Sequence, residues 1–120
     1  MTVTYTEDDR TKIAELSVNG KVTKNDFNAV AGKLEAFMKK HGKVKILEDI
    51  QNYEGFELST MWEGIKFDAK NLKHVSHCAV VSDISIIKPL AKATSLLTPL
   101  EIKTFPKGQV KQARQWLSKQ

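Results

Sequence analysis

The chain has 120 residues, of which 41% are hydrophobic and 28% are charged. This composition is typical of one globular domain and excludes a disordered chain. The single cysteine, Cys78, excludes a disulfide within the chain and favours a reducing compartment. No apolar run approaches the roughly 18 residues that span a bilayer, and the first ten residues lack the apolar stretch of a signal peptide. We therefore expect a cytoplasmic protein without membrane insertion.

The net charge of +5 is unevenly distributed along the chain. Residues 1–60 carry 9 basic and 10 acidic side chains, whereas residues 61–120 carry 10 basic and 4 acidic ones. Such asymmetry can steer an anionic partner, although a lysine-rich solvated surface is the simpler interpretation. Arginine, which suits bidentate phosphate recognition, occurs only at Arg10 and Arg114. With no nucleic-acid-binding motif in the sequence, we expect no nucleic-acid partner.

The first predicted elements are two strands and a helix. Residues 2–6 alternate apolar and polar side chains, and residues 13–18 form a second strand that ends at Asn19-Gly20. The short connection between them predicts an antiparallel hairpin. Thr23 and Asp26 make a variant of the capping box, and Gly42 ends the helix that follows. The helix carries one apolar stripe, typical of packing on a sheet, made of Phe27, Val30, Ala31, Leu34, Phe37 and Met38.

The remaining elements alternate between strands and helices. The predicted order is a strand over 43–50, a connection over 51–57, a helix over 58–71, a strand over 77–82, a helix capped by Asp83, a strand over 100–105 and a helix from residue 110. Strands separated by helices need crossovers and therefore run in parallel. The sequence predicts a single α/β domain over residues 1–120, with a five-stranded, mostly parallel sheet, an antiparallel edge strand and four helices.

Six segments resemble one known family in their order and spacing. They are VNGKVTKNDF at 18–27, HGKVKILEDI at 41–50, MWEGIKF at 61–67, LKHVSHCAVVSD at 72–83, LLTPLEIKTF at 96–105 and ARQWL at 113–117. Together they are similar to the SpoIIAA-like family of small bacterial proteins, which is related in fold to STAS domains and to CRAL-TRIO lipid-binding domains. The resemblance extends from about Tyr5 to Leu117, and it implies a STAS-like fold.

The resemblance implies two different functions. STAS proteins such as anti-sigma-factor antagonists are partner-binding switches, phosphorylated on a serine in a D-S-S-G-like motif. The comparable stretch here is Glu57-Leu58-Ser59-Thr60, so Ser59 is the candidate for phosphorylation, although the preceding Asp and the Gly of the motif are absent. CRAL-TRIO domains enclose an apolar ligand but are considerably longer than this chain.

Large apolar side chains gather around the predicted connection and second helix. Met61 and Trp62 fit the inward stripe of that helix, whereas Tyr53, Phe56 and Phe67 fit it less well. We predict that Tyr53, Phe56, Trp62 and Phe67 form a surface for a protein partner, or line a pocket for a small apolar or amphipathic ligand. A place in the hydrophobic core is the simplest interpretation, and it accounts for Met61 and Trp62.

Two groups of polar residues raise the question of catalysis or metal binding. Carboxylates cluster at Glu48, Asp49, Glu54, Glu57 and Glu63. Paired carboxylates can transfer protons or bind a hard cation, but a solvated acidic rim explains them more simply.

The second group is His74, His77 and Cys78, which is an incomplete ligand set for a metal, and neighbours on a strand point to opposite faces. We predict a non-enzymatic regulatory or protein-interaction module without cofactor or metal, and a homodimer is compatible with its acidic and basic halves.

Overall fold

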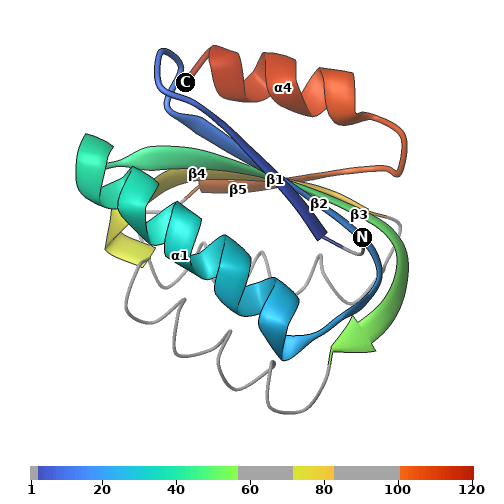
Figure 1. Ribbon diagram of the computed structural model, residues 1–120. Helices are drawn as coiled ribbons and strands as arrows, with labels where there is room; N and C mark the ends of the chain where they lie inside the picture. The colour runs from blue at the N-terminus through green and yellow to red at the C-terminus, as the bar shows by residue number, and fades with distance from the viewer. Residues whose placement is uncertain (1–2, 57–71, 83–100) are drawn as a thin grey trace.

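The computed structural model describes residues 3–56, 72–82 and 101–120. Five strands form one sheet in the order β1-β2-β3-β4-β5 (Figure 1). Strand β1 pairs antiparallel with β2, and the other neighbouring pairs are parallel. The strands are β1 (Val3–Asp8), β2 (Ile13–Val22), β3 (Val44–Phe56), β4 (Val75–Val81) and β5 (Glu101–Phe105). The predicted α/β architecture, with a mostly parallel sheet and an antiparallel edge strand, is confirmed.

Helices α1 (Lys24–His41) and α4 (Val110–Ser118) lie on opposite faces of this sheet (Figure 1), and a short 3-10 helix, η1 (Leu72–His74), precedes β4. These two α-helices match the first and the last of the four predicted helices. The second and third predicted helices fall outside the described residues. Within the described residues, no helix has the length and apolar character that crossing a membrane requires.

Both ends of α1 are fixed by the residues that the sequence singled out. The Thr23 hydroxyl accepts a hydrogen bond from the Asp26 N–H at 3.1 Å, and the Asp26 carboxylate accepts one from the Thr23 N–H at 3.2 Å. This reciprocal pair satisfies two backbone donors that the first turn leaves unpaired. At the other end Gly42 has a φ of 80° and donates its N–H to the Met38 carbonyl at 2.7 Å.

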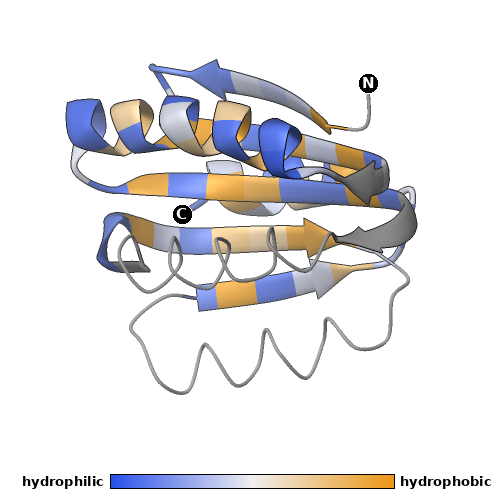
Figure 2. Ribbon diagram, turned by 60° about the horizontal axis from the view of Figure 1, so that its bottom comes forward, coloured by the Kyte–Doolittle hydropathy of each residue, from blue (hydrophilic) through white to orange (hydrophobic). Residues whose placement is uncertain are grey.

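The sheet is buried on both faces because successive apolar residues of its strands belong in turn to two hydrophobic clusters; Figure 2 shows that apolar and polar segments follow one another along β3. On the α1 face the cluster contains Ala14, Leu34, Phe37, Met38, Val44, Ile46, Val75, Cys78 and Val80. On the α4 face it contains Ile13, Leu47, Ala79, Val81, Phe105, Ala113 and Leu117. The apolar stripe predicted for α1 is thus buried at Leu34, Phe37 and Met38.

Strands β2 and β3 are longer than the sequence predicted. The Asn19-Gly20 pair does not end β2, and the predicted connection after residue 50 instead continues β3 to Phe56. The pairing of the two strands shifts register at Asn19/Gly20 and again at Gly20/Val22. Gly20 has a φ of 93°, a conformation that serves a β-bulge as well as a turn. Beyond the bulges the end of β3 curls toward the α1 side of the sheet (Figure 1).

Candidate functional site: a polar groove beside α4

Helix α4 covers only part of its face of the sheet. It packs mainly against β3, β4 and β5, whereas α1 packs on β1, β2 and β3 from the opposite face. Among the described elements, only α4 lies on its face (Figure 1), and it leaves β1 and most of β2 open there. The side chains of β1 and β2 that point to this face therefore remain accessible beside the helix.

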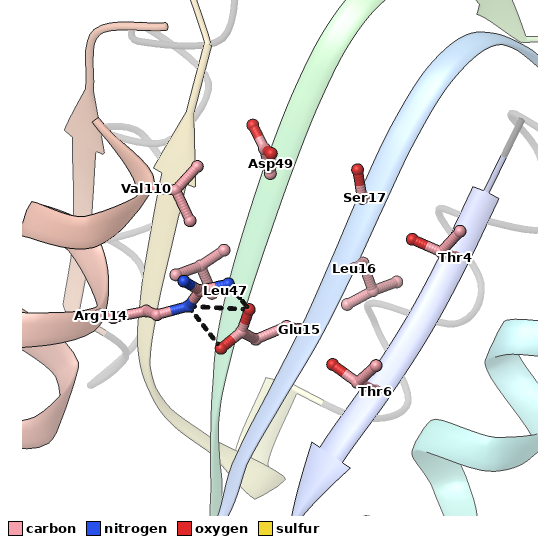
Figure 3. A pocket seen from close by; sticks show the side chains of 9 residues that line it. All are labelled: Thr4, Thr6, Glu15, Leu16, Ser17, Leu47, Asp49, Val110 and Arg114. Carbon is pink, nitrogen blue, oxygen red and sulfur yellow. Dashed lines mark hydrogen bonds and ion pairs between the residues drawn. The ribbon is translucent and has the colours of Figure 1, made fainter. Parts of the chain in front are cut away.

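Two adjoining hollows, of about 270 and about 400 Å³, occupy this open area. They share Thr6, Glu15 and Arg114, and we call them together the α4 groove. The first hollow (Figure 3) is lined by Thr4, Thr6, Glu15, Leu16, Ser17, Leu47, Asp49, Val110 and Arg114. The second is lined by Thr6, Glu7, Asp8, Thr11, Ile13, Glu15, Arg114 and Ser118.

An ion pair between the helix and the sheet divides the groove. The Arg114 Nε donates to both Glu15 carboxylate oxygens, at 3.1 and 2.9 Å, and Nη2 donates to Oε1 at 2.8 Å (Figure 3). These hydrogen bonds raise the pKa of Arg114, and the negative charge of Asp49 acts in the same direction. The side chain of Arg114 is 56% exposed and that of Glu15 is 28% exposed. A bidentate pair of this kind fixes the guanidinium in one orientation, so that it spans the groove from α4 to β2.

The strand registers arrange the remaining polar groups in two rows across the sheet. Thr4 pairs with Ser17, and Ser17 pairs with Asp49. One step along the strands, Thr6 pairs with Glu15, and Glu15 pairs with Leu47. Residues two apart on a strand share a face, so both rows point into the groove, as Figure 3 shows.

The chemistry of the groove is mixed, with polar and apolar surface side by side. Hydroxyl groups lie on β1 and β2, and the one guanidinium stands between two carboxylates, Glu15 and Asp49. The Asp49 carboxylate also accepts a hydrogen bond from the Gln51 side chain at 2.8 Å. Such a lining offers a second molecule a positively charged donor, negatively charged acceptors and neutral hydroxyl groups that do both. Within residues 3–56, 72–82 and 101–120, no three His, Cys, Asp or Glu side chains come together as a metal site would require.

Comparison with known proteins places the chain in a family. A family model described as SpoIIAA-like matches residues 13–118. The chain belongs to the SpoIIAA-like family. The resemblance of the six sequence segments is thereby confirmed, and the matched range includes β2, β3 and α4, which carry most of the groove.

A solved structure supports the same fold for this SpoIIAA-like domain. It is that of an uncharacterised protein of the DUF3478 family with a SpoIIAA-like fold, from Shewanella loihica. The two chains are 20% identical, and the match covers 96% of this chain and 93% of that chain with a TM-score of 0.79. At this identity the likeness shows the fold alone. No curated protein matches the chain.

The aromatic surface predicted for this SpoIIAA-like domain is only partly within the described residues. Tyr53 and Phe56 belong to β3, where they pair with Gly20 and Val22, and not to a connection. Trp62, Phe67 and the candidate phosphorylation residue Ser59 lie outside the described residues. The interpretation of these residues as a partner or ligand surface stays a prediction.

The prediction of an acidic rim around a loop is wrong for Glu48 and Asp49. Glu48 and Asp49 are consecutive residues inside β3, so they point to opposite faces of the sheet, and only Asp49 lines the groove. The sequence analysis took them for the end of a strand because β3 was predicted to stop at residue 50. Glu54 also belongs to β3, and Glu57 and Glu63 lie outside the described residues.

His74, His77 and Cys78 do not form one cluster. His77 and Cys78 are neighbours on a strand and were predicted to point to opposite faces, as they do. Cys78 is buried in the cluster on the α1 face. The His77 ring meets the ring of Trp116 edge-on on the α4 face, with centroids 5.8 Å apart, and its Nε2 lies 3.3 Å from a Glu101 carboxylate oxygen. His74 instead contacts the backbone, with Nδ1 2.9 Å from the carbonyl oxygen of Gly42.

Proposed function

We propose that this SpoIIAA-like domain is a non-enzymatic interaction module that binds a protein partner in the α4 groove. The observation that carries the proposal is the arrangement of five hydrogen-bonding side chains in two rows, Thr4–Ser17–Asp49 and Thr6–Glu15, on a sheet face that α4 leaves open. Thr4 and Thr6 are exposed, and Ser17 and Asp49 are half-buried. These groups are accessible from outside and held in a fixed order by the strand registers.

The chemistry of the lining favours a protein partner over a small apolar ligand. Pockets for small ligands are lined predominantly by apolar and aromatic side chains, whereas a protein interface is about as polar as the rest of the surface. The α4 groove has the second character, since hydroxyls, carboxylates and one guanidinium outnumber Leu16, Leu47 and Val110 in its first hollow. An apolar or amphipathic ligand is therefore the alternative and not the first choice.

The polar groups of the groove support recognition in preference to catalysis. Both carboxylates already accept hydrogen bonds from neighbouring side chains, Glu15 from Arg114 and Asp49 from Gln51. These contacts orient the two carboxylates and the guanidinium before a partner arrives. Groups ordered in advance lose less conformational entropy on binding.

The aromatic residues predicted from the sequence belong to the same proposal. Beyond Asp49, strand β3 continues to Phe56, so the chain leads directly from the groove to Tyr53 and Phe56. We propose that Tyr53, Phe56, Trp62 and Phe67 extend the partner surface, and that Ser59 regulates it by phosphorylation. Alanine at Tyr53, Phe56 and Phe67 should then weaken capture of the partner found through the groove.

Photocrosslinking in the cells that produce the protein tests the proposal. A photoreactive amino acid is placed at Thr6 or Ser17 in the groove, with the same group at Lys33, exposed on α1, as the matched control. We expect both groove positions to give one discrete adduct with a protein other than a second copy of this chain, which the control lacks and which Arg114→Ala reduces. Adducts identical at all three positions would overturn the proposal. A small retained mass in native mass spectrometry, without a protein adduct, would favour the alternative.

A further inference from the structure

Strand β1 is one of the two edges of the sheet and is paired on one side only, with β2. It lies at the upper margin of the sheet in Figure 2, and no described element lies beyond it. Edge strands of soluble proteins usually avoid pairing with another chain by being short or by carrying a proline, a bulge or charged side chains. Strand β1, with the sequence VTYTED, has no proline, and its pairing with β2 runs in one register over its whole length.

The charges of β1 are concentrated at its carboxyl end. Glu7 and Asp8 are exposed there, whereas Val3 to Thr6 carry no charge. A second β1 laid alongside in the parallel direction would bring like charges together, which is destabilising. In the antiparallel direction, each acidic end instead meets the uncharged beginning of the other strand.

The threonines of β1 pair with one another in one antiparallel register. With a two-fold axis at Tyr5, Thr4 lies opposite the partner's Thr6, and Val3 lies opposite the partner's Glu7. Thr–Thr pairs directly across two strands are favourable. Thr4 and Thr6 are exposed on the groove side, so the four threonines of two copies would meet on that face without displacing any core residue.

We propose that two copies of the chain pair through antiparallel β1 strands about a two-fold axis at Tyr5. The pairing is isologous, since the same strand supplies both halves of the interface, and it continues one sheet through both copies. The threonine wall of each α4 groove then becomes the boundary between two grooves, so the second copy contributes its own Thr4 and Thr6 to a single longer groove. This assembly does not depend on whether the groove binds another protein.

The mass of the protein in solution, measured by light scattering over a range of concentrations, tests the proposal. We expect the wild-type mass to rise from 13.5 kDa to twice that value as the concentration increases. The combination of Thr4→Lys with Thr6→Lys places lysine opposite lysine in the proposed register, and this variant should remain monomeric. The combination of Thr4→Lys with Thr6→Glu places opposite charges across the axis, and it should restore the dimer.

Controls keep the test independent of folding. Both threonines are exposed, so the circular dichroism spectrum of each variant should match that of the wild type at a concentration at which the wild type is monomeric. Asn25→Lys with Ala29→Lys adds the same charge to the exposed side of α1 and should leave the dimer intact. The proposal is overturned if the wild type is monomeric throughout, if the double lysine variant still dimerises, or if the lysine–glutamate variant stays monomeric. It is also overturned if β1 binds an added extended peptide and not its own copy.

Discussion

Replacing Leu117 with alanine tests how α4, the helix that forms one wall of the groove, is held on the sheet. Leu117 has no exposed surface and packs in the cluster formed with β2, β3, β4 and β5. Removing a fully buried leucine side chain usually costs about 2–5 kcal/mol, because transfer energy is lost and a cavity remains. A helix of nine residues is not stable on its own, so α4 depends on this packing. We expect a loss of about 3 kcal/mol for Leu117→Ala.

Urea unfolding followed by circular dichroism measures this loss. Thermal unfolding gives a second measure of the same loss. With an unfolding entropy of about 2.1 cal/mol/K per residue, a loss of about 3 kcal/mol lowers the Tm of the 120-residue chain by about 12 °C. Gln115→Ala, at an exposed position of the same helix, is the matched control and should change the free energy of unfolding by less than about 0.5 kcal/mol. A loss below about 1 kcal/mol for Leu117→Ala would refute the docking of α4 described above, and with it the fixed position of Arg114.

Three further predictions follow from individual contacts. Thr23→Ala removes the α1 cap and should lower the free energy of unfolding by about 1 kcal/mol, whereas Thr23→Ser should retain most of it. A double-mutant cycle on Glu15 and Arg114 should give a coupling of about 0.5–1 kcal/mol, small because the pair is partly exposed; a coupling of zero would contradict this contribution to stability. Hydrogen bonds from His41 and then Lys40 lower the pKa of Asp9 below 3.8. The ionised Asp9 carboxylate therefore stabilises the folded state above pH 3.8, and this contribution is lost as the pH falls through the lowered pKa. Asp9→Asn should make the free energy of unfolding fall less steeply with decreasing pH, and an unchanged slope would contradict the contact.

The sequence predicted helices and strands well where the signal came from residues close together in the chain. Thr23 and Asp26 lie three residues apart, and their side chains form the predicted capping box. Strand β4 was recognised from its apolar run and is buried from Cys78 to Val81. In each case the deciding interactions involve neighbours in the chain or simple alternation, which a pattern can report.

Local reasoning failed at Asn19-Gly20 for a physical reason. The dipeptide favours a positive φ, and Gly20 has one. A positive φ serves a hairpin turn or a bulge inside a strand equally well, and only the pairing of β2 with β3 decides between them. The choice of a turn shortened β2. The interpretation of residues 51–57 as a connection separately shortened β3, and it moved Glu48 and Asp49 from the interior of a strand to its end.

The groove itself could not have been predicted from the sequence. Glu15 and Arg114 are 99 positions apart in the chain, and their meeting depends on how α4 is docked. The neighbourhood of Ser17 and Asp49 depends on the register of β2 against β3, which the hydrophobic pattern constrains only through the faces it buries. The available signal was weak: Glu15 and Ser17 are polar residues on the same strand face as the buried Ile13.

The order of the strands across the sheet, which equals their order along the chain, has a consequence for biosynthesis. The β1–β2 hairpin closes over a short turn, whereas every later strand must wait for its intervening segment before it can pair. Each later strand then adds to the edge left by the one before it, so the sheet can assemble in the sequence in which the ribosome delivers it. Among the described strands, β1 and β2 are therefore paired first, so the proposed pairing of β1 with a second copy can begin before the rest of the sheet is complete.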